Sequence, residues 1–144
     1  MSSDNQNQPA IGQICWLEIP VHDIKRASKL YSEIFGWKIN EEAMPMDQPG
    51  IQAMHVFAAP ERKLGGALLV MEENYQMTRY GKLEKEVLPP LPTLCVKDCD
   101  ETLKQVESLG GSTQLPKTAI GGNMGHCARF HDSEGNVIGI WSQN

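Results

Sequence analysis

Residues 14–36 read ICWLEIPVHDIKRASKLYSEIFG, and residues 94–111 read LCVKDCDETLKQVESLGG. In the first stretch an apolar, β-prone run ends at Asp23, apolar residues then recur at helical spacing, and Gly36 ends the pattern. The second stretch follows the same plan, with its own aspartate at the helix start and two glycines at its end. Equivalent residues of the two stretches are all separated by the same number of positions along the chain. The sequence therefore predicts two copies of a unit that begins with a strand and a helix.

Three further apolar runs follow each helix, at 37–39, 51–58 and 66–70 in the first copy and near 112–115, 126–130 and 136–141 in the second. The last two runs are joined by Asp-Ser-Glu-Gly-Asn at 132–136, a pattern typical of a hairpin turn. We therefore expect the order β-α-β-β-β twice within one domain. The predicted divisions are a disordered tail 1–11, a first module 12–71, a polar, proline-rich linker 72–89 and a second module 90–143.

Composition excludes several classes of protein. The chain has 144 residues and a net charge of −5, and its 13 basic residues are scattered, which argues against a nucleic-acid partner. No apolar run approaches the roughly 20 residues that cross a bilayer, and the polar N-terminal segment is unlike a signal peptide. The four cysteines form no C-x-x-C pair and fit small buried side chains in a reducing compartment. We expect a cytoplasmic protein with no nucleic-acid or membrane partner.

Several of these motifs resemble the vicinal oxygen chelate superfamily, which includes glyoxalase I, bleomycin- and fosfomycin-resistance proteins and extradiol dioxygenases. The resemblance rests on Trp-Leu-Glu-Ile-Pro-Val-His-Asp at 16–23, Ala27, Tyr31, Phe-Gly-Trp at 35–37, Gly-Gly at 65–66 and Phe-His-Asp-Ser-Glu-Gly-Asn at 130–136. The last motif is similar to the family's closing turn, with Ser133 in place of a proline. The resemblance covers residues 12 to 143. It implies an α+β fold, the glyoxalase/bleomycin-resistance fold, in which two tandem βαβββ modules form a curved mixed sheet around a cup.

The resemblance also implies where a metal would be held. Family enzymes bind a divalent metal with His, Glu or Gln from the first and fourth strands of each module, and the metal polarises substrate oxygens. In this chain the corresponding places carry Trp16, the aliphatic strand 65–70, Leu91 and Gly139, none of which offers a suitable donor. We therefore predict that the family metal site is absent and that the protein needs no cofactor. One alternative stays open, a metal held elsewhere by Glu18, His55 and His126.

Without a metal the cup is expected to be apolar and aromatic. Trp16 offers a flat stacking face, and Glu18, two residues further along the strand, is expected to face the same way. Trp141 and Arg129 of the second module and His55 of the first complete the predicted ligand-binding set. The alternative for the two tryptophans is that they simply fill the core.

Glu18 is also the candidate catalytic residue, because a carboxylate in an apolar strand is costly unless it is paired, exposed or functional. If it is buried it could serve as a general base. The alternative is an ion pair with Arg129, Arg26 or Lys38.

Three functions remain open. The first is metal-independent binding of an unidentified small molecule in an apolar, aromatic-lined cup, as in resistance-type sequestration. The second is a lyase or isomerase related to lactoylglutathione lyase, with altered chemistry that uses Glu18. The third is a structural or regulatory module whose cup is filled by its own side chains. The resemblance further implies a homodimer.

Overall fold

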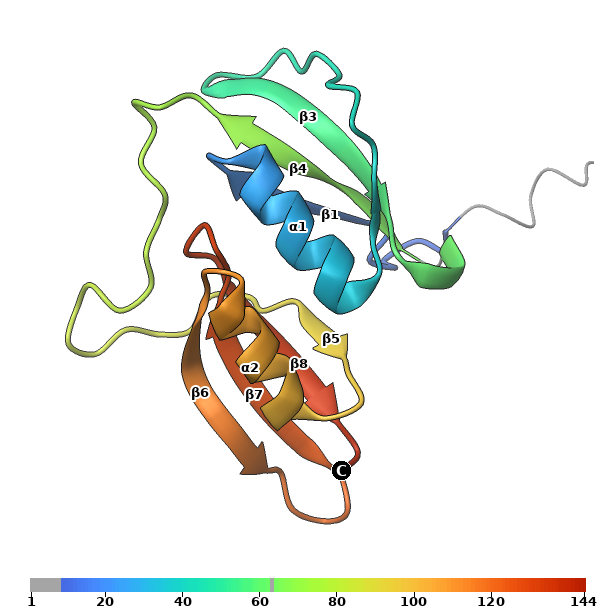
Figure 1. The fold of residues 1–144 in the computed structure, drawn as a ribbon, viewed down its shortest axis with the longest axis vertical. Coiled ribbons are helices and arrows are strands. Elements are labelled where there is room, and N and C mark those ends of the chain that lie inside the picture. Colours follow the sequence, from blue (N-terminus) through green and yellow to red (C-terminus); the bar gives the residue numbers. More distant parts are fainter. Residues whose placement is uncertain (1–8, 63) are drawn as a thin grey trace, which may run out of the picture.

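The computed structural model describes residues 9–62 and 64–144, and residues 1–8 of the predicted tail lie outside the described residues. Two modules follow one another along the chain (Figure 1). The first contains β1 (Trp16–Val21), α1 (Ile24–Phe35), β2 (Lys38–Ile39), β3 (Ile51–Ala58), the short 3₁₀ turn η2 (Pro60–Arg62) and β4 (Gly65–Met71). The second contains β5 (Thr93–Cys95), α2 (Cys99–Ser108), β6 (Ser112–Ala119), β7 (His126–His131) and β8 (Val137–Ser142). The predicted order of elements is confirmed.

Local signals explain the bounds of α1. The Asp23 carboxylate accepts a hydrogen bond from the Arg26 amide at 3.1 Å, which satisfies one of the free N–H groups at the helix start. Gly36 takes φ 69°, a left-handed conformation that favours glycine and turns the chain out of the helix. In the second module the Asp98 carboxylate caps α2 in the same way, through the amide of Asp100.

Each module forms its own mixed sheet of four strands. The strand orders are β1-β4-β3-β2 and β5-β8-β7-β6, so the two sheets are equivalent. In each, the first strand of the module runs parallel to the last, and the remaining pairs are antiparallel. The two-module fold expected from the sequence is confirmed, with two hydrogen-bonded sheets.

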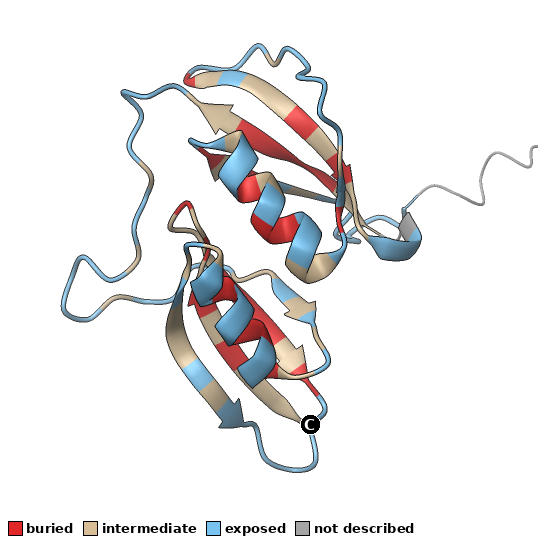
Figure 2. Cartoon of the chain, in the orientation of Figure 1, coloured by how far each residue is buried: buried red, intermediate tan, exposed pale blue. Residues whose placement is uncertain are grey.

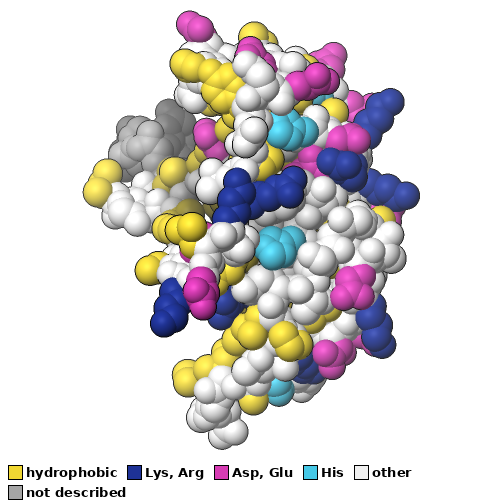
Figure 3. All heavy atoms as spheres, turned by 90° about the vertical axis from the view of Figure 1, so that its left-hand side faces the viewer, with side chains coloured by type: hydrophobic (Ala, Val, Ile, Leu, Met, Phe, Trp, Pro, Cys, Tyr) yellow, Lys and Arg dark blue, Asp and Glu magenta, His cyan; other side chains and the backbone are white. Residues whose placement is uncertain are grey.

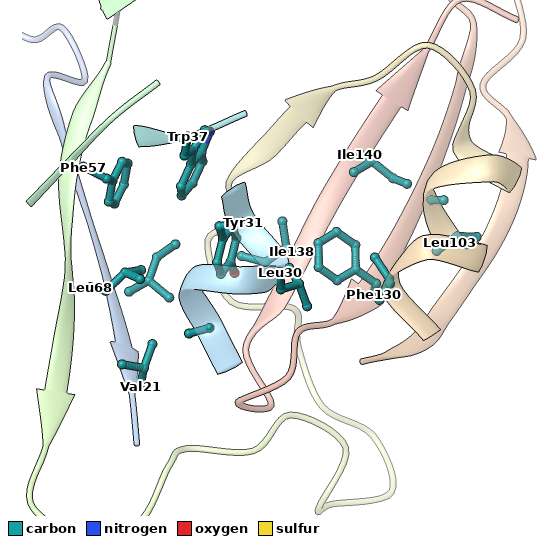
Figure 4. Close-up of a cluster of buried hydrophobic side chains, with 14 of the residues drawn as sticks. Val21, Leu30, Tyr31, Trp37, Phe57, Leu68, Leu103, Phe130, Ile138 and Ile140 are labelled. Atoms are coloured by element: carbon teal, nitrogen blue, oxygen red, sulfur yellow. The ribbon is translucent and has the colours of Figure 1, made fainter. Parts of the chain in front are cut away.

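One hydrophobic core joins the modules (Figures 2 and 4). Trp37 stacks on Tyr31 at 4.8 Å and on Phe57 at 4.2 Å between ring centroids, which fixes α1 on the first sheet. Phe35 of α1 reaches across and stacks on Phe130 of β7 at 6.1 Å. Each helix covers one face of its own sheet (Figure 1). No helix among the described residues is long and apolar enough to cross a membrane.

Candidate functional site

Strand β1 presents alternate residues to opposite sides. Ile19 and Val21 are buried in the core that α1 covers, whereas Trp16 and Glu18 are exposed, Trp16 at 44%. A strand turns successive side chains to opposite faces, so Trp16 and Glu18 share the face directed away from α1. Strand alternation in the sequence predicted this shared orientation, and the structure has it.

The neighbouring strands extend this face with apolar residues. Trp16 pairs with Gly65, Glu18 with Ala67, and Ala67 in turn with Val56 of β3. A β-carbon on Gly65 would lie 3.7 Å from the Trp16 ring, so the indole lies over the glycine. We call this surface the open face of the first sheet. It consists of Trp16, Glu18, Met54, Val56, Ala58, Gly65, Ala67 and Leu69. Of these, Glu18 alone is charged, Trp16 and Glu18 are exposed, and Ala67 and Leu69 are buried.

A hollow of about 640 Å³ adjoins the open face, and we call it the cup hollow. Its walls come from three parts of the chain: Glu18 and Pro20 of β1, Val137 at the start of β8, and Tyr80, Leu83 and Val87 of the linker. A volume of this size falls within the usual range for small-molecule pockets, and such pockets are mostly apolar with a few polar groups. Glu18 is the polar group that β1 supplies.

The candidate residues of the second module lie on the equivalent face of the second sheet. Arg129 pairs with Gly139, and Trp141 pairs with Cys127, on the side away from α2. The Trp141 indole N–H donates to the Met124 carbonyl at 2.7 Å, so this half-buried ring already has its polar partner. Neither Arg129 nor Trp141 lines the cup hollow, and Trp16 does not line it either. Of the five predicted ligand-binding residues, Glu18 is therefore the one that lines the cup hollow.

His55 occupies a different place from the one expected. It is 8% exposed, it pairs with Leu68, a core residue, and its Nδ1 lies 2.8 Å from the Asn40 carbonyl oxygen. It lines a separate hollow with Ile24 and Lys25 of α1. His55 therefore faces the helix side of the sheet, and Glu18 faces the other side.

The alternative metal set of Glu18, His55 and His126 is not assembled. His126 pairs with Ser142, whose hydroxyl donates to the Cys99 sulfur of α2, so His126 also lies toward a helix. Within the described ranges, no three His, Cys, Asp or Glu residues come together in an arrangement that could hold a metal ion.

The positions that hold the metal in the family do not fit one here. Gly139 has no side chain, and a β-carbon built on it would approach Thr93 Oγ1 to 2.6 Å and Leu91 Cδ2 to 3.0 Å. These two neighbours fill the space that a ligand side chain would need. Trp16, at the equivalent place on β1, can offer only an N–H donor. The residues present therefore do not suit a divalent cation at this place.

Glu18 lacks the burial on which its predicted role as a general base depends, because it is exposed to solvent. No ion pair links it to Arg129, Arg26 or Lys38 in the part of the chain that the structure describes. Arg26 instead binds Glu134, with Nε 2.7 Å from the carboxylate Oε2.

The part that the linker plays in this site was not predicted from the sequence. Tyr80, Leu83 and Val87 line the cup hollow, although the sequence predicts a polar, proline-rich linker at 72–89. The signal that could have found them is the alternation of apolar side chains with charges just before Pro89, Pro90 and Pro92, which stiffen the chain.

Comparisons with known proteins agree with this fold. A family model described as bleomycin resistance protein-like N-terminal matches residues 13–48. A glyoxylase-like domain-containing protein from Didymella fabae is 28% identical over 132 residues, which cover 90% of this chain and 92% of the relative. A putative glyoxylase, CFP32, from Mycobacterium bovis is 24% identical over 131 residues, and the chain spans 45% of that relative's length.

Solved structures show the same fold. A glyoxylase/bleomycin resistance protein/dioxygenase domain from Frankia sp. EAN1pec superposes with a TM-score of 0.66 at 15% identity, covering 92% of this chain and 98% of that one. The antibiotic-binding protein TnmS3 from Streptomyces sp. CB03234 has a TM-score of 0.54 at 22% identity, with 94% and 98% covered. The chain is thus a protein of the glyoxalase/bleomycin-resistance fold. The resemblance seen in its sequence is confirmed by homologues and by structural neighbours of that superfamily.

Proposed function

We propose that this protein is a cytoplasmic, homodimeric binder of an aromatic or apolar small molecule, that it acts without a metal, and that it sequesters its ligand as resistance proteins do. The observation that carries the proposal is the placement of Trp16 and Glu18 on one open, apolar face beside the cup hollow of about 640 Å³. Trp16 and Glu18 are the exposed members of this face, and an exposed aromatic ring beside a hollow is suited to bind an apolar ligand.

The dimensions support a ligand with a ring system. Residues two positions apart on a strand, such as Trp16 and Glu18, are separated by about 7 Å. A ligand with a fused ring system could therefore stack on Trp16 and reach the Glu18 carboxylate. That carboxylate favours a ligand with a cationic or hydrogen-bond-donating group at this end. The likeness to an antibiotic-binding protein adds support for a ligand of this class. A hollow of this size also counts against a cup filled by the protein's own side chains.

The test uses two probes, the uncharged fluorophore N-phenyl-1-naphthylamine and metal-free bleomycin, titrated in the presence of a chelator. We expect Trp16→Ala to weaken binding of whichever probe binds by about tenfold, because a central aromatic contact contributes on the order of 1–2 kcal/mol. The matched control is Met124→Ala, which removes another exposed apolar side chain, 57% exposed, from the second module and outside the open face of the first sheet. Equal affinities for the wild type and Trp16→Ala would contradict the proposed site.

A second function is favoured by one observation, the relationship over nearly the whole chain to a glyoxylase-like protein. On this alternative the protein is a lyase or isomerase of glutathione-derived substrates, with Glu18 moving the proton. Turnover of the methylglyoxal–glutathione adduct, measured with and without added divalent metal, distinguishes the two. Turnover that disappears in Glu18→Gln would favour the enzyme, and binding without turnover would favour the sequestering protein.

A further inference from the structure

A second hollow, of about 850 Å³, lies on the other side of the linker. It is bounded by the turn after β1, the first turn of α1, the linker and the turn between β7 and β8. We call it the polar hollow, and its basic and imidazole side chains are those of His22, Arg26, Arg79, Lys82 and His131. Figure 3 shows the face that carries the linker, with Lys, Arg and His side chains grouped across its middle.

The acidic residues that line the polar hollow are already engaged, with one exception. The Glu134 side chain is 1% exposed, and its oxygens accept from the His22 and Asp23 amides, from Arg26 Nε and from the Ser133 hydroxyl. Asp132 is 3% exposed and is likewise fully hydrogen-bonded. Only Glu73 of the lining carboxylates is exposed.

The basic side chains, in contrast, keep free donors. Arg26 is 49% exposed, and Glu134 binds its Nε, so the buried carboxylate holds the guanidinium in place, and its two terminal nitrogens make no hydrogen bond among the described residues. Arg79 and Lys82 have no ion-pair partner among the described residues. Fixed arginine donors with unpaired cations beside them suit a phosphate or carboxylate group. Three cations and three carboxylates line the hollow, so its formal charges balance, but two of the carboxylates are buried and already hydrogen-bonded, which leaves the cations as the more available charges.

The same hollow has aromatic walls. Tyr75 and Tyr80 both line it. The linker is anchored at Tyr75, whose carbonyl oxygen lies 2.8 Å from His22 Nε2 and whose ring fills the space beside Gly50. An aromatic ring next to cationic groups can hold an organic anion by its apolar part as well as by its charge.

We propose that the polar hollow is a second ligand site, separate from the cup hollow, and that it takes a small aromatic or apolar molecule bearing a phosphate or carboxylate. Arg26, Arg79 and Lys82 bind the anionic group, and the two tyrosines hold the ring. Arg79 and Tyr80 line both hollows, so the linker forms the wall between the two sites.

The test compares phenyl phosphate, benzoate, inorganic phosphate and phenol by isothermal titration calorimetry on the full chain. We expect phenyl phosphate or benzoate to bind more tightly than inorganic phosphate and phenol, with affinity that falls as salt is raised. Lys82→Glu should weaken that binding by about tenfold, because it places a repelling charge beside the anion. The stronger of the two organic anions identifies the preferred group.

The matched control is Lys85→Glu, the same change three residues further along the linker. Lys85 lines the cup hollow and not the polar hollow, so organic-anion binding should be unchanged in this variant. Lys82→Glu should in turn leave N-phenyl-1-naphthylamine binding unaltered, which separates this proposal from the proposed function. Absence of binding at millimolar concentration, or equal losses in both variants, would overturn the second site.

Discussion

The Tyr31 hydroxyl in the middle of α1 donates a hydrogen bond of 2.6 Å to Asp132 Oδ2 in the turn before β8. Tyr31 is fully buried and Asp132 is 3% exposed, so this bond joins the two modules inside the core. The remaining capacity of the carboxylate is taken by the amides of Glu134 and Asn136 and by the Asn136 side chain. The turn that resembles the family's closing motif is thus one of the places where the second module attaches to α1, besides the stacking of Phe35 on Phe130.

Removing that hydroxyl tests how much the contact contributes. We expect Tyr31→Phe to lower the free energy of unfolding by about 1–3 kcal/mol, because it leaves a buried carboxylate oxygen short of one donor. Urea denaturation followed by circular dichroism measures the change. Tyr75→Phe, at an exposed ring on the linker, should change stability little. If the free energy of unfolding fell by a similar amount in both variants, the hydrogen bond from Tyr31 to Asp132 would have no special part in stability.

Two carboxylates in this turn should make stability depend on pH in opposite directions. Burial alone would raise the pKa of Glu134, but hydrogen bonds from Arg26 and from the Asp23 and His22 amides outweigh it and lower the pKa below its ordinary 4.5. Burial raises the pKa of Asp132 above its ordinary 3.8, and bonds from Tyr31 and Asn136 offset this only in part. The stability that Glu134 contributes is therefore present above pH 4.5 and is lost as the pH falls through its folded pKa. The stability that Asp132 contributes is present below pH 3.8 and is lost as the pH rises through its raised folded pKa.

The measurement is the unfolding free energy of the wild type and of two variants across the acid range. The advantage of the wild type over Glu134→Gln should shrink as the pH falls below 4.5. The advantage of the wild type over Asp132→Asn should instead shrink as the pH rises above 3.8. Parallel pH profiles for the two variants would contradict the opposite shifts.

Two adjacent glycines of β4 should respond very differently to the same substitution. A β-carbon on Gly66 would lie 1.9 Å from the Leu17 carbonyl oxygen and 2.5 Å from Phe57, so backbone would have to move. On Gly65 the nearest atom is 3.4 Å away, an ordinary contact. We expect Gly66→Ala to destabilise the protein by about 3 kcal/mol or more and Gly65→Ala by less than about 1 kcal/mol. Thermal unfolding of the two variants checks this, and equal melting temperatures would refute it.

The sequence was most informative where the determining interactions are local. The bounds of α1 were predictable because Asp23 and Gly36 both act within one turn of the helix. The shared orientation of Trp16 and Glu18 was predictable because β1 is regular and its alternation can be counted. The repeated order of elements followed from the two matching stretches.

Other features depend on contacts that no local pattern reveals. The direction of His55 could not be counted from the start of β3, because the pairing of β3 with β4 is irregular between Ile51 and Ala53 and shifts the alternation. The pairing of Arg26 with Glu134 joins residues far apart in the chain, and it removes Arg26 from the partners expected for Glu18. The part that the linker plays in both hollows likewise depends on tertiary packing.

A last prediction concerns divalent metal. The family's ligand positions hold Trp16 and Gly139 here, and the space at Gly139 is occupied by Leu91 and Thr93, so a cation has no set of donors to bind. A ligand present at one hundred times its dissociation constant adds about 2.7 kcal/mol of stability and raises the melting temperature by several degrees. We expect no such rise with Mn²⁺, Ni²⁺ or Zn²⁺ relative to chelator, and unchanged binding of N-phenyl-1-naphthylamine. A rise that chelator reverses and that Glu18→Gln abolishes would instead place a metal beside Glu18 and contradict the proposed metal-independent binding.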